Sequence, residues 1–486
     1  MSILQNVIAS RTLFLRCCAV ILACAAGLAA VLNTFDAWHL AALPFEMNYE
    51  EGNILNAALR IVNGLSPYPD PHAFPNVLNP YGPVFYYLVA IPVRVAGAGL
   101  LLPRLMVIIA ALMAAICIGL LIRKEGQAPA LAIAAGCLFI ASPLVYFWMP
   151  LLRADLLGLA LTLAGMCVFR SKHWRWSVPL FVLALFVKVT LLAGPAAGLA
   201  FMIARRQWRR AAWFAAAGLA GILCVFGMAQ WLTHGWFSFH IFKTHGDPFS
   251  WRLVAWNLGG MVKLDFPLVV LSVCYLAIKG RDRDLSLPAL YLLFAALATV
   301  TSGKLGSDSN HLLELHAALT LTGSLALASL VERIPHRWLA LSTAAGATAL
   351  LVFVSERNPR VIDERAMLRD CGQVYAFVQR TRGEVLADNV GMLVLTHKPV
   401  VISNPFVYRY LVAQGWPDTE LRNRVQSRGF AAIVLSSNPL NSPLDNSQRW
   451  SAGVLDDIKQ NYVPVGHFQC TEANTVLLPA KSENVQ

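Results

Sequence analysis

Two adjacent carboxylates, Glu50 and Glu51, are the residues whose type and spacing most directly suggest chemistry in this chain. They lie in the stretch 48–52, just after the first hydrophobic segment. Carboxylates beside a bilayer are costly unless they face water, a cation or a substrate. One of them could act as a general base that takes a proton from a hydroxyl group. A solvated pair in a loop, or the acidic start of an amphipathic helix over 53–63, would explain the same residues.

A second candidate is Arg153-Ala154-Asp155, at the mouth of a later loop. The two charges could form a structural ion pair at a helix start, where an acidic side chain favours the helix dipole. Alternatively, Arg153 could hold a phosphate group while Asp155 organises a base or a cation.

Two further loops carry cationic groups. In the loop 233–261, Lys243 and His245 are interleaved with Trp and Phe residues. This mixture suits lipid headgroup depth, and it would also hold a lipid phosphate. The histidines lack the helical spacing of a zinc site.

In the later stretch, which begins at Lys304, Asp308 could cap a helix on which His311 and Glu314 share one face. Ionisable groups at a membrane entry are functional candidates, although a capped helix with His311 at headgroup depth is an equally simple interpretation. Lys188 is a further charge inside an apolar run, where it could meet a phosphate or pair with an acidic side chain.

The composition indicates a polytopic membrane protein that must place these residues. The 486 residues are 57% hydrophobic and only 14% charged, with a mean hydropathy of +0.57, whereas soluble domains carry about 25% charged residues. The net charge of +12 comes largely from basic clusters in short loops. That distribution follows the positive-inside rule, so it indicates topology rather than nucleic-acid binding.

Hydrophobic runs predict about eleven membrane spans: 13–34, 102–122, 128–149, 155–170, 176–189, 190–204, 211–232, 262–279, 285–302, 311–331 and 337–354. With the N-terminus in the cytoplasm and no cleaved signal peptide, the basic loops fall inside and the loops with the candidate residues, including 35–101, fall outside. The short run 83–97 is predicted as an interfacial or re-entrant helix. Residues 176–204 should turn around 193–195, or form one long tilted span.

The predicted membrane module, 1–354, is followed by a polar segment, 355–486, that reads as a small extracytoplasmic α/β domain. Strands are predicted near 384–387, 400–402, 431–435 and 475–478, and helices near 364–381, 406–413, 418–428 and 451–461. The only two cysteines of this segment, Cys371 and Cys470, permit a disulfide in an oxidising compartment.

In this order, the residues resemble polyprenyl-phosphate-sugar-dependent glycosyltransferases of the GT-C fold. The nearest group is the bacterial family-39-like superfamily, which includes protein O-mannosyltransferases and the lipid A aminoarabinose transferase. The resemblance rests on Glu50-Glu51, on the stretches 63–68 and 79–87, each of which ends in a tyrosine, on Arg153 to Asp155, and on Asp308 to Glu314. Glu50 stands where the family commonly has Asp, so either glutamate could be the base.

The resemblance implies an enzyme of the bacterial cytoplasmic (inner) membrane that moves a sugar from a polyprenyl-phosphate donor to a lipid, glycan or protein acceptor. Glu50 would deprotonate the acceptor and give inversion, with Glu51 and Asp155 in the catalytic set. The implied phosphate-binding candidates are Arg153, Lys243, His245, Lys304 and His311. The implied substrate contacts are Tyr68, Tyr81, Asp308 and Glu314.

Other functions stay open at this point. A flippase or transporter of lipid-linked sugars would want polar residues at mid-membrane and paired half-repeats. A polymerase or ligase of lipid-linked glycans and an inactive relative that only binds the lipid-linked sugar are further alternatives. Asp155 and Glu51 could hold a divalent cation, but two carboxylates alone do not require one.

Overall fold

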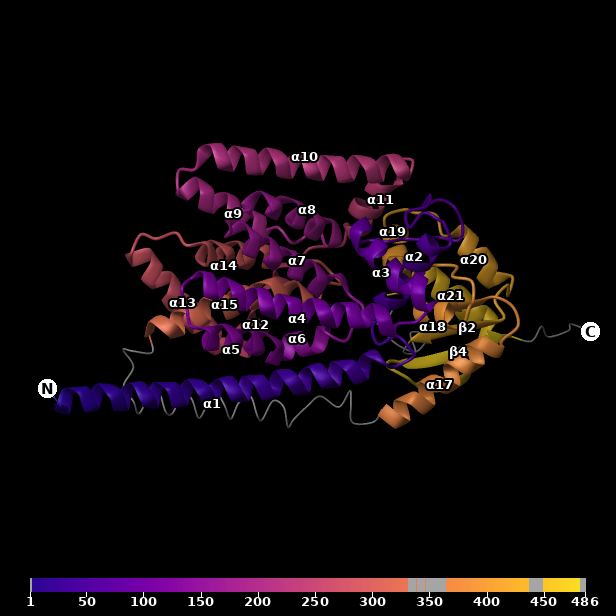
Figure 1. The fold of residues 1–486 in the computed structure, drawn as a ribbon. Coiled ribbons are helices and arrows are strands. Elements are labelled where there is room, and N and C mark those ends of the chain that lie inside the picture. Colours follow the sequence, from indigo (N-terminus) through magenta and orange to yellow (C-terminus); the bar gives the residue numbers. More distant parts are fainter. Residues whose placement is uncertain (1, 331–337, 339–345, 347–363, 437–448, 481–486) are drawn as a thin grey trace, which may run out of the picture. The chain divides into compact units, whose positions relative to one another are not determined.

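The structure, a computed structural model, describes residues 2–330, 338, 346, 364–436 and 449–480 (Figure 1). The chain divides into two compact units, which are described separately here. The first unit comprises Met1–Leu40, Leu105–Val225 and Pro248–Asn358. The second comprises Ala41–Arg104, Phe226–Asp247 and Pro359–Gln486. The predicted boundary at 354/355 lies outside the described residues and stays a prediction.

The first unit is helical. Its helices, three of which (α1, α4 and α10) have end residues in the second unit, are α1 (Ser2–Ala41), α4 (Leu101–Lys124), α5 (Pro129–Ala141), α6 (Pro143–Trp148), α7 (Ala154–Phe169), α8 (Ser177–Val187), α9 (Ala193–Ala204), α10 (Trp208–Leu232), α12 (Trp251–Leu264), α13 (Phe266–Arg281), α14 (Leu287–Ala298) and α15 (Leu313–Leu330). The short 3-10 turns are η1 (Trp174–Trp176), η3 (Thr299–Gly303) and η4 (Ser309–Leu312).

The helices are those of a multi-pass membrane protein. Four described segments are long and apolar enough to cross a membrane: Val20–Ala41, Leu101–Lys124, Trp208–Leu232 and Ser309–Leu330. The pair α12 and α13, bent by 94°, would make a fifth. Shorter apolar helices coincide with most of the other predicted spans. The total of eleven stays a prediction, because 337–354 lies almost wholly outside the described residues.

Two predicted segments are interrupted. The run 128–149 divides at Ser142, which ends α5 and caps α6 by accepting a hydrogen bond from the Leu144 N–H. The turn predicted around 193–195 was placed too late, because α8 ends at Val187 and the break covers 188–192. Lys188 is therefore at a helix end rather than inside a helix, and this position lets a charged side chain leave the apolar face.

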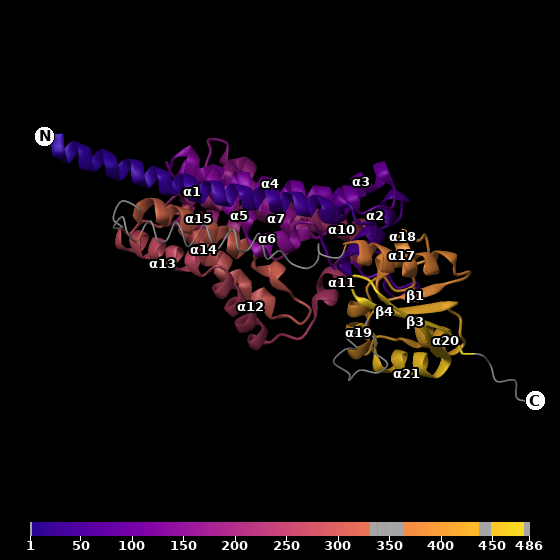
Figure 2. The same ribbon diagram turned by 90° about the horizontal axis from the view of Figure 1, so that it is seen from below.

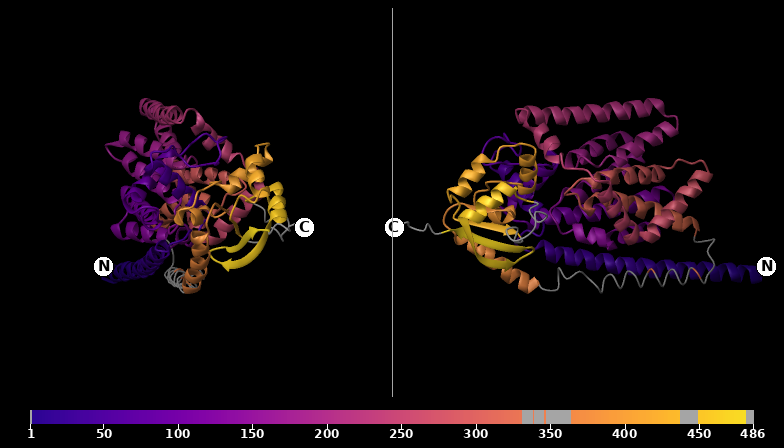
Figure 3. Two further views of the ribbon diagram at one scale, coloured as in Figure 1. Left: turned by 90° about the vertical axis from the view of Figure 1, so that its right-hand side faces the viewer. Right: turned by 180° about the vertical axis from the view of Figure 1, so that it is seen from behind.

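Close helix packing surrounds this break. Helix α7 lies against α8 at Gly165, where an added Cβ would come within 2.7 Å of the Phe181 ring. Helix α10 runs beside α8 and α9 (Figure 3). A Cβ added to Gly221 of α10 would come within 3.1 Å of the Val182 side chain of α8. Small residues at these crossings let the helices approach closely. Helices in a membrane associate through such close packing, because lipid provides no hydrophobic driving force between them.

The second unit contains a four-stranded sheet with the order β1-β2-β4-β3. Its strands are β1 (Val385–Ala387), β2 (Ala432–Ser436), β3 (Tyr462–Gln469) and β4 (Ala473–Pro479). β1 and β2 are parallel, with Leu386 opposite Ile433, while β4 is antiparallel to both β2 and β3. β1 and β2 are wholly buried, as strands covered on both faces must be.

Helices cover both faces of this sheet. In Figure 2, α17 and α18 lie on one side and α19, α20 and α21 on the other. The helices of the second unit are α2 (Glu50–Val62), α3 (Pro83–Ala96), α11 (Trp236–Phe242), α17 (Glu364–Arg380), α18 (Val390–Leu395), α19 (Pro405–Ala413), α20 (Thr419–Gln426) and α21 (Ala452–Asn461), with the 3-10 turn η2 (Lys243–His245). Apolar residues of α19, α20 and α21 form one core with Leu386, Ile433 and Leu435.

Several predicted elements need correction. The strand predicted near 400–402 is not part of the sheet: Ile402 instead makes an isolated parallel bridge to Asn76. Strand β3 and helix α18 were not predicted, and α12 lies in what was predicted as a loop. The helix predicted over 53–63 begins earlier, at Glu50, so the acidic pair belongs to its first turn. The helix predicted over 83–97 is present as α3.

Candidate functional site

The acidic pair is buried in the second unit and does not lie in a wet loop. Glu50 is 5% exposed and Glu51 is 0% exposed. Their carboxylates occupy the first turn of α2, where acidic groups suit the positive end of the helix dipole. Because successive residues of a helix point about 100° apart, the two side chains enter different surroundings.

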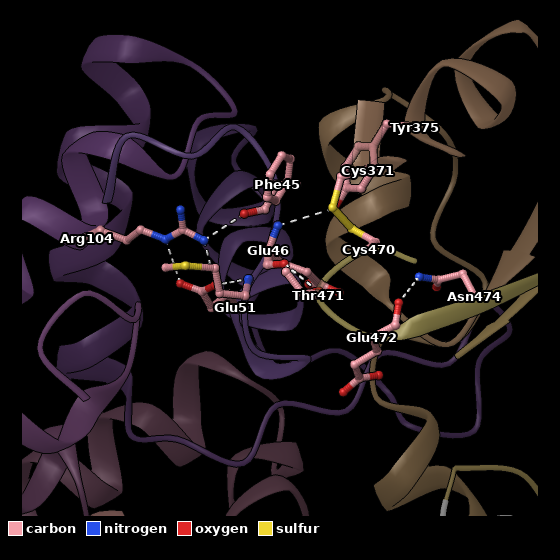
Figure 4. The surroundings of a disulfide bond; sticks show 11 residues. Phe45, Glu46, Glu51, Arg104, Cys371, Tyr375, Cys470, Thr471, Glu472 and Asn474 are labelled. Atoms are coloured by element: carbon pink, nitrogen blue, oxygen red, sulfur yellow. Dashed lines mark hydrogen bonds and ion pairs between the residues drawn. A yellow bond between two sulfur atoms is a disulfide. The ribbon is translucent and has the colours of Figure 1, made fainter. Parts of the chain in front are cut away.

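Glu51 is held by Arg104, which is also completely buried (Figure 4). Arg104 donates from Nε to Oε1 at 2.8 Å and from Nη2 to Oε2 at 2.7 Å. The backbone N–H groups of Met47 and Asn48 donate to the same Oε2, at 2.7 and 3.3 Å. The other Arg104 donors bind backbone carbonyl groups, those of Leu43 and Phe45, at 2.8 Å each. Both carboxylate oxygens of Glu51 are thus engaged by donors, and this arrangement suits a role in holding the structure together.

Glu50 has fewer partners. Its Oε1 accepts a hydrogen bond from Asn404 Nδ2 at 3.0 Å. Its Oε2 has a contact of 3.5 Å with Asn53 Nδ2, at the limit of hydrogen-bond length. Of the two carboxylates, Glu50 is the one with an oxygen still able to take a proton.

A third carboxylate, Glu46, lies close by and was not predicted. Its Oε2 accepts from the backbone N–H groups of Gly52 and Gly391, at 3.0 and 2.9 Å. Its Oε1 is buried and has no hydrogen-bond partner within the described part of the chain. Complete burial, with the negative charge of Glu51 nearby, raises the pKa of Glu46 well above its usual range. Each of these two glycines brings its backbone against the carboxylate, where a Cβ would come within about 2.5 Å of it.

The disulfide that the sequence permits, between Cys371 and Cys470, is present (Figure 4). Each cysteine lies close in sequence to a residue whose side chain makes a hydrogen bond to the backbone of Glu46. Tyr375, one turn along α17, receives the Glu46 N–H on its hydroxyl at 3.3 Å. Thr471 donates from its hydroxyl to the Glu46 carbonyl oxygen at 3.2 Å. The disulfide therefore joins α17 to the turn between β3 and β4, and residues of both hold the backbone just before α2.

The remaining predicted residues of the second unit lie elsewhere in it. Tyr68 is buried against Tyr86, and its hydroxyl donates to the Tyr81 carbonyl oxygen at 2.7 Å. Lys243 is exposed, and His245 Nδ1 lies 2.7 Å from the Ile241 carbonyl oxygen. None of these contacts involves Glu50.

The first unit holds a separate polar cluster around Asp155. Asp155 Oδ1 accepts a hydrogen bond from Asn310 Nδ2 at 2.9 Å and forms a buried ion pair with Lys188. Arg153 Nε is 3.8 Å from Asp155 Oδ2, and its guanidinium lies over the Trp148 ring. The break between α8 and α9 brings Lys188 to the start of α7, which explains how a charge inside an apolar run is accommodated.

The late outer stretch completes this cluster. Glu314 is buried, accepts from the Gly194 backbone N–H and faces Lys188. His311 Nδ1 is 3.0 Å from the Thr301 hydroxyl. Asp308 is exposed and caps η4, while Lys304 is half-buried at the bridge to Phe249. The polar lining of one small cavity consists of Asp155, Lys188, Thr190, Thr301, Asn310, His311 and Glu314.

The structure thus gathers Arg153, Asp155, Lys188, His311 and Glu314, and it adds Asn310. Arg104, Asn404 and Glu46 were missed. Arg104 had a signal, a single charge in an apolar run, whereas Asn404 had none because its partner is 354 residues away. Within the described ranges, no three His, Cys, Asp or Glu side chains gather as a metal site would require.

Comparison with known proteins gives a family match over residues 71–205, to the N-terminal domain of alpha-(1->6)-mannopyranosyltransferases. No curated protein sequence matches the chain.

Solved structures match over nearly the whole chain. ArnT from Cupriavidus metallidurans in the apo state aligns with a TM-score of 0.61 and 13% identity, covering 92% of this chain and 96% of that one. The same protein bound to undecaprenyl phosphate gives 0.60 and 13%, with 93% and 98% covered. The oligosaccharyltransferase AglB from Archaeoglobus fulgidus, in complex with an inhibitory peptide and a dolichol-phosphate, gives 0.50 and 12%, with 97% and 74% covered.

The chain thus has the GT-C fold of these glycosyltransferase structures, and its described apolar helices are those of a multi-pass membrane protein.

Proposed function

We propose that the protein transfers a sugar from a polyprenyl-phosphate donor to a lipid, glycan or protein acceptor on the extracytoplasmic face of a bacterial cytoplasmic membrane, with Glu50 as the general base. The donor class is supported by the undecaprenyl phosphate and dolichol-phosphate bound to the similar structures. The domain match supports a mannosyl-type sugar.

The observation that carries the proposal is the unequal treatment of the two glutamates. Glu51 is engaged by Arg104 and two backbone N–H groups, so protonating it would cost a buried ion pair. Glu50 keeps one weakly engaged oxygen in a nearly dry environment. A carboxylate placed in this way suits proton removal from an incoming hydroxyl group.

The proposed reaction is a single displacement. Glu50 takes the proton of the acceptor hydroxyl as the acceptor oxygen attacks the anomeric carbon. The bond from that carbon to the phosphate oxygen breaks, and its electron pair leaves with the polyprenyl phosphate. The sugar is inverted, and the proton rests on Glu50 until it is released to water.

The charge that develops on the leaving phosphate needs cationic donors. As a separate proposal for the first unit, Arg153, Lys188 and His311 bind a lipid phosphate, with Asp155 and Asn310 holding them in position. Lys304 borders the same stretch, and the exposed Lys243 and the neighbouring His245 are better suited to lipid headgroups. The roles of Glu50 and of this cluster belong to separate units and are tested separately.

The test compares the purified wild type with Glu50→Gln and its matched control, Glu51→Gln. Each protein is incubated with a panel of polyprenyl-phosphate sugars and acceptors, and donor binding is measured alongside transfer. We expect Glu50→Gln to bind donor and to lose at least about a hundredfold in turnover. Glu51→Gln should keep turnover in proportion to the protein that stays folded. The product anomer, read by NMR, should be inverted.

Each outcome has a clear meaning. Wild-type turnover by Glu50→Gln would remove Glu50 as the base. Binding of a lipid-linked sugar by the wild type with neither transfer nor hydrolysis across the acceptor panel would favour a flippase or an inactive relative. No binding of any lipid-linked sugar would overturn the donor class.

A further inference from the structure

Among the described residues, Asn404, in the C-terminal part of the second unit, makes the one well-formed hydrogen bond to the Glu50 carboxylate. Its Nδ2 lies 3.0 Å from Glu50 Oε1, and both residues are buried. A hydrogen bond from a neutral amide stabilises the ionised form of a carboxylate without neutralising it. The oxygen opposite the contact, Oε2, is left as the proton acceptor.

The direction of the Asn404 amide is fixed by a second role. Asn404 is the N-cap of α19, and its Oδ1 accepts the Val407 backbone N–H at 3.1 Å. An N-cap must present an oxygen to the helix. The amide therefore cannot turn without losing the cap, and the NH₂ group is obliged to face Glu50.

The position of Asn404 along the chain is fixed as well. The preceding residue, Ser403, donates its backbone N–H to the Asn76 carbonyl oxygen at 3.0 Å, and its hydroxyl accepts the Leu78 N–H at 2.7 Å. The Leu78 carbonyl oxygen in turn receives Asn53 Nδ2 at 3.4 Å, one helical turn after Glu50. The amide is thus anchored to the same segment that supports α2.

We propose that Asn404 is a positioning residue for the reaction, and that it holds Glu50 ionised with Oε2 directed toward the acceptor hydroxyl. This inference rests on the proposed role of Glu50. The C-terminal part of the chain would then orient the general base, in addition to any contact that it makes with the acceptor.

The other charged groups around this turn are already committed. Glu51 is paired with Arg104, and Glu46 is held by the Gly52 and Gly391 N–H groups. Arg449 lies over the Tyr49 ring and binds Glu472. Asn404 is therefore the group at which the surroundings of Glu50 can be changed most selectively.

Two substitutions separate the cap from the contact. Asn404→Ser keeps an oxygen that caps α19 but removes the NH₂ group that faces Glu50. Asn404→Asp keeps the cap, and replaces the NH₂ group with a carboxylate oxygen beside Glu50. Ser451→Ala is the matched control, because Ser451 caps α21 of the same unit and is not among the partners of Glu50.

In transfer assays with a polyprenyl-phosphate sugar, we expect Asn404→Ser to lose roughly 10- to 100-fold in kcat with donor KM unchanged, because the base is no longer oriented. For Asn404→Asp, the acidic limb of the pH–rate profile should move to higher pH by about one unit or more, because two like charges share the site. Ser451→Ala should keep the wild-type kcat and pH profile.

The outcomes separate this inference from the proposed function. If Glu50→Gln is inactive while both Asn404 variants keep the wild-type kcat and pH profile, the positioning role is refuted and the base stands. If Glu50→Gln is active, the proposed base fails and the inference falls with it. Equal losses in Asn404→Ser and Ser451→Ala would show that the loss does not depend on the contact with Glu50, and would also refute the role.

Discussion

The ion pair between Glu51 and Arg104 should stabilise the second unit and take no part in proton transfer. The perturbation that tests this is Glu51→Gln, which keeps the shape of the side chain and removes its charge. Arg104 would then remain fully buried, with backbone carbonyl groups and a neutral amide oxygen as its acceptors.

The magnitude follows from the complete burial of both side chains. Removing one partner of a buried pair costs about 3 to 5 kcal/mol in the free energy of unfolding, because the other charge is left uncompensated. For a unit of this size, that loss corresponds to a fall in Tm of roughly 6 to 20 °C. Glu50→Gln should shift Tm far less, since the Gln carbonyl oxygen can still accept from Asn404.

The assay is thermal unfolding of the full-length protein in detergent, with turnover measured well below Tm. A double variant, Glu51→Gln with Arg104→Met, removes both charges and should be less destabilised than the sum of the two single variants. Substitution of Glu51 should thus change mainly Tm, whereas substitution of Glu50 should change mainly turnover. A Glu51→Gln protein with wild-type Tm and no turnover would refute this reasoning.

Three further predictions concern the disulfide, the first-unit cluster and a buried histidine. Replacing Cys371 and Cys470 together with Ser should lower stability by about 2 to 4 kcal/mol and make Tm insensitive to reductant; an unchanged Tm would contradict this. Lys188→Met should weaken donor binding at least about tenfold, because it removes a cation from the proposed phosphate site and leaves Asp155 with the more distant Arg153 as its cationic partner. The control Lys279→Met, at a partly exposed pair with Asp284, should not weaken binding, and equal affinities of the two variants would contradict the phosphate role. Burial lowers the pKa of His240 to about 4, so its stabilising contribution is complete above pH 6.5 and is lost as the pH falls toward 4. The free energy of unfolding of the wild type, relative to that of His240→Asn, should therefore fall by about 3 kcal/mol between pH 6.5 and 4. The difference between their Tm values should shrink accordingly, and a constant difference would contradict the assignment.

Local sequence patterns predicted most of the C-terminal part of the chain. Its four predicted helices are present as α17, α19, α20 and α21, because amphipathic periodicity and caps are encoded within each segment. Strand β3 was missed since it lies at the sheet edge, carries a proline and is largely exposed, so it lacks the continuous apolar run of a buried strand. The segment 400–402 is apolar but pairs with residue 76, which no local pattern could show.

The candidate residues were predicted by type, but their partners were not. The two carboxylates and the single arginine of an apolar run, Arg104, can be read from the sequence. The pairing of Glu51 with Arg104 cannot, because it depends on how α4 begins beside the loop that precedes α2. The cluster of Asp155 and Lys188 likewise required the break after α8 to be placed correctly. Each miss is a long-range contact that forms only when separate segments fold together.

The two glutamates show why an acidic pair in a sequence does not by itself identify a base. Glu51 turns toward Arg104 and the backbone of residues 47–48, and those donors hold its charge in place. That arrangement fixes the first turn of α2 and, with it, the backbone of Glu50. Glu50 is held by a neutral amide from a distant segment, so its charge is oriented but not cancelled. One carboxylate can then be reactive because its neighbour is not.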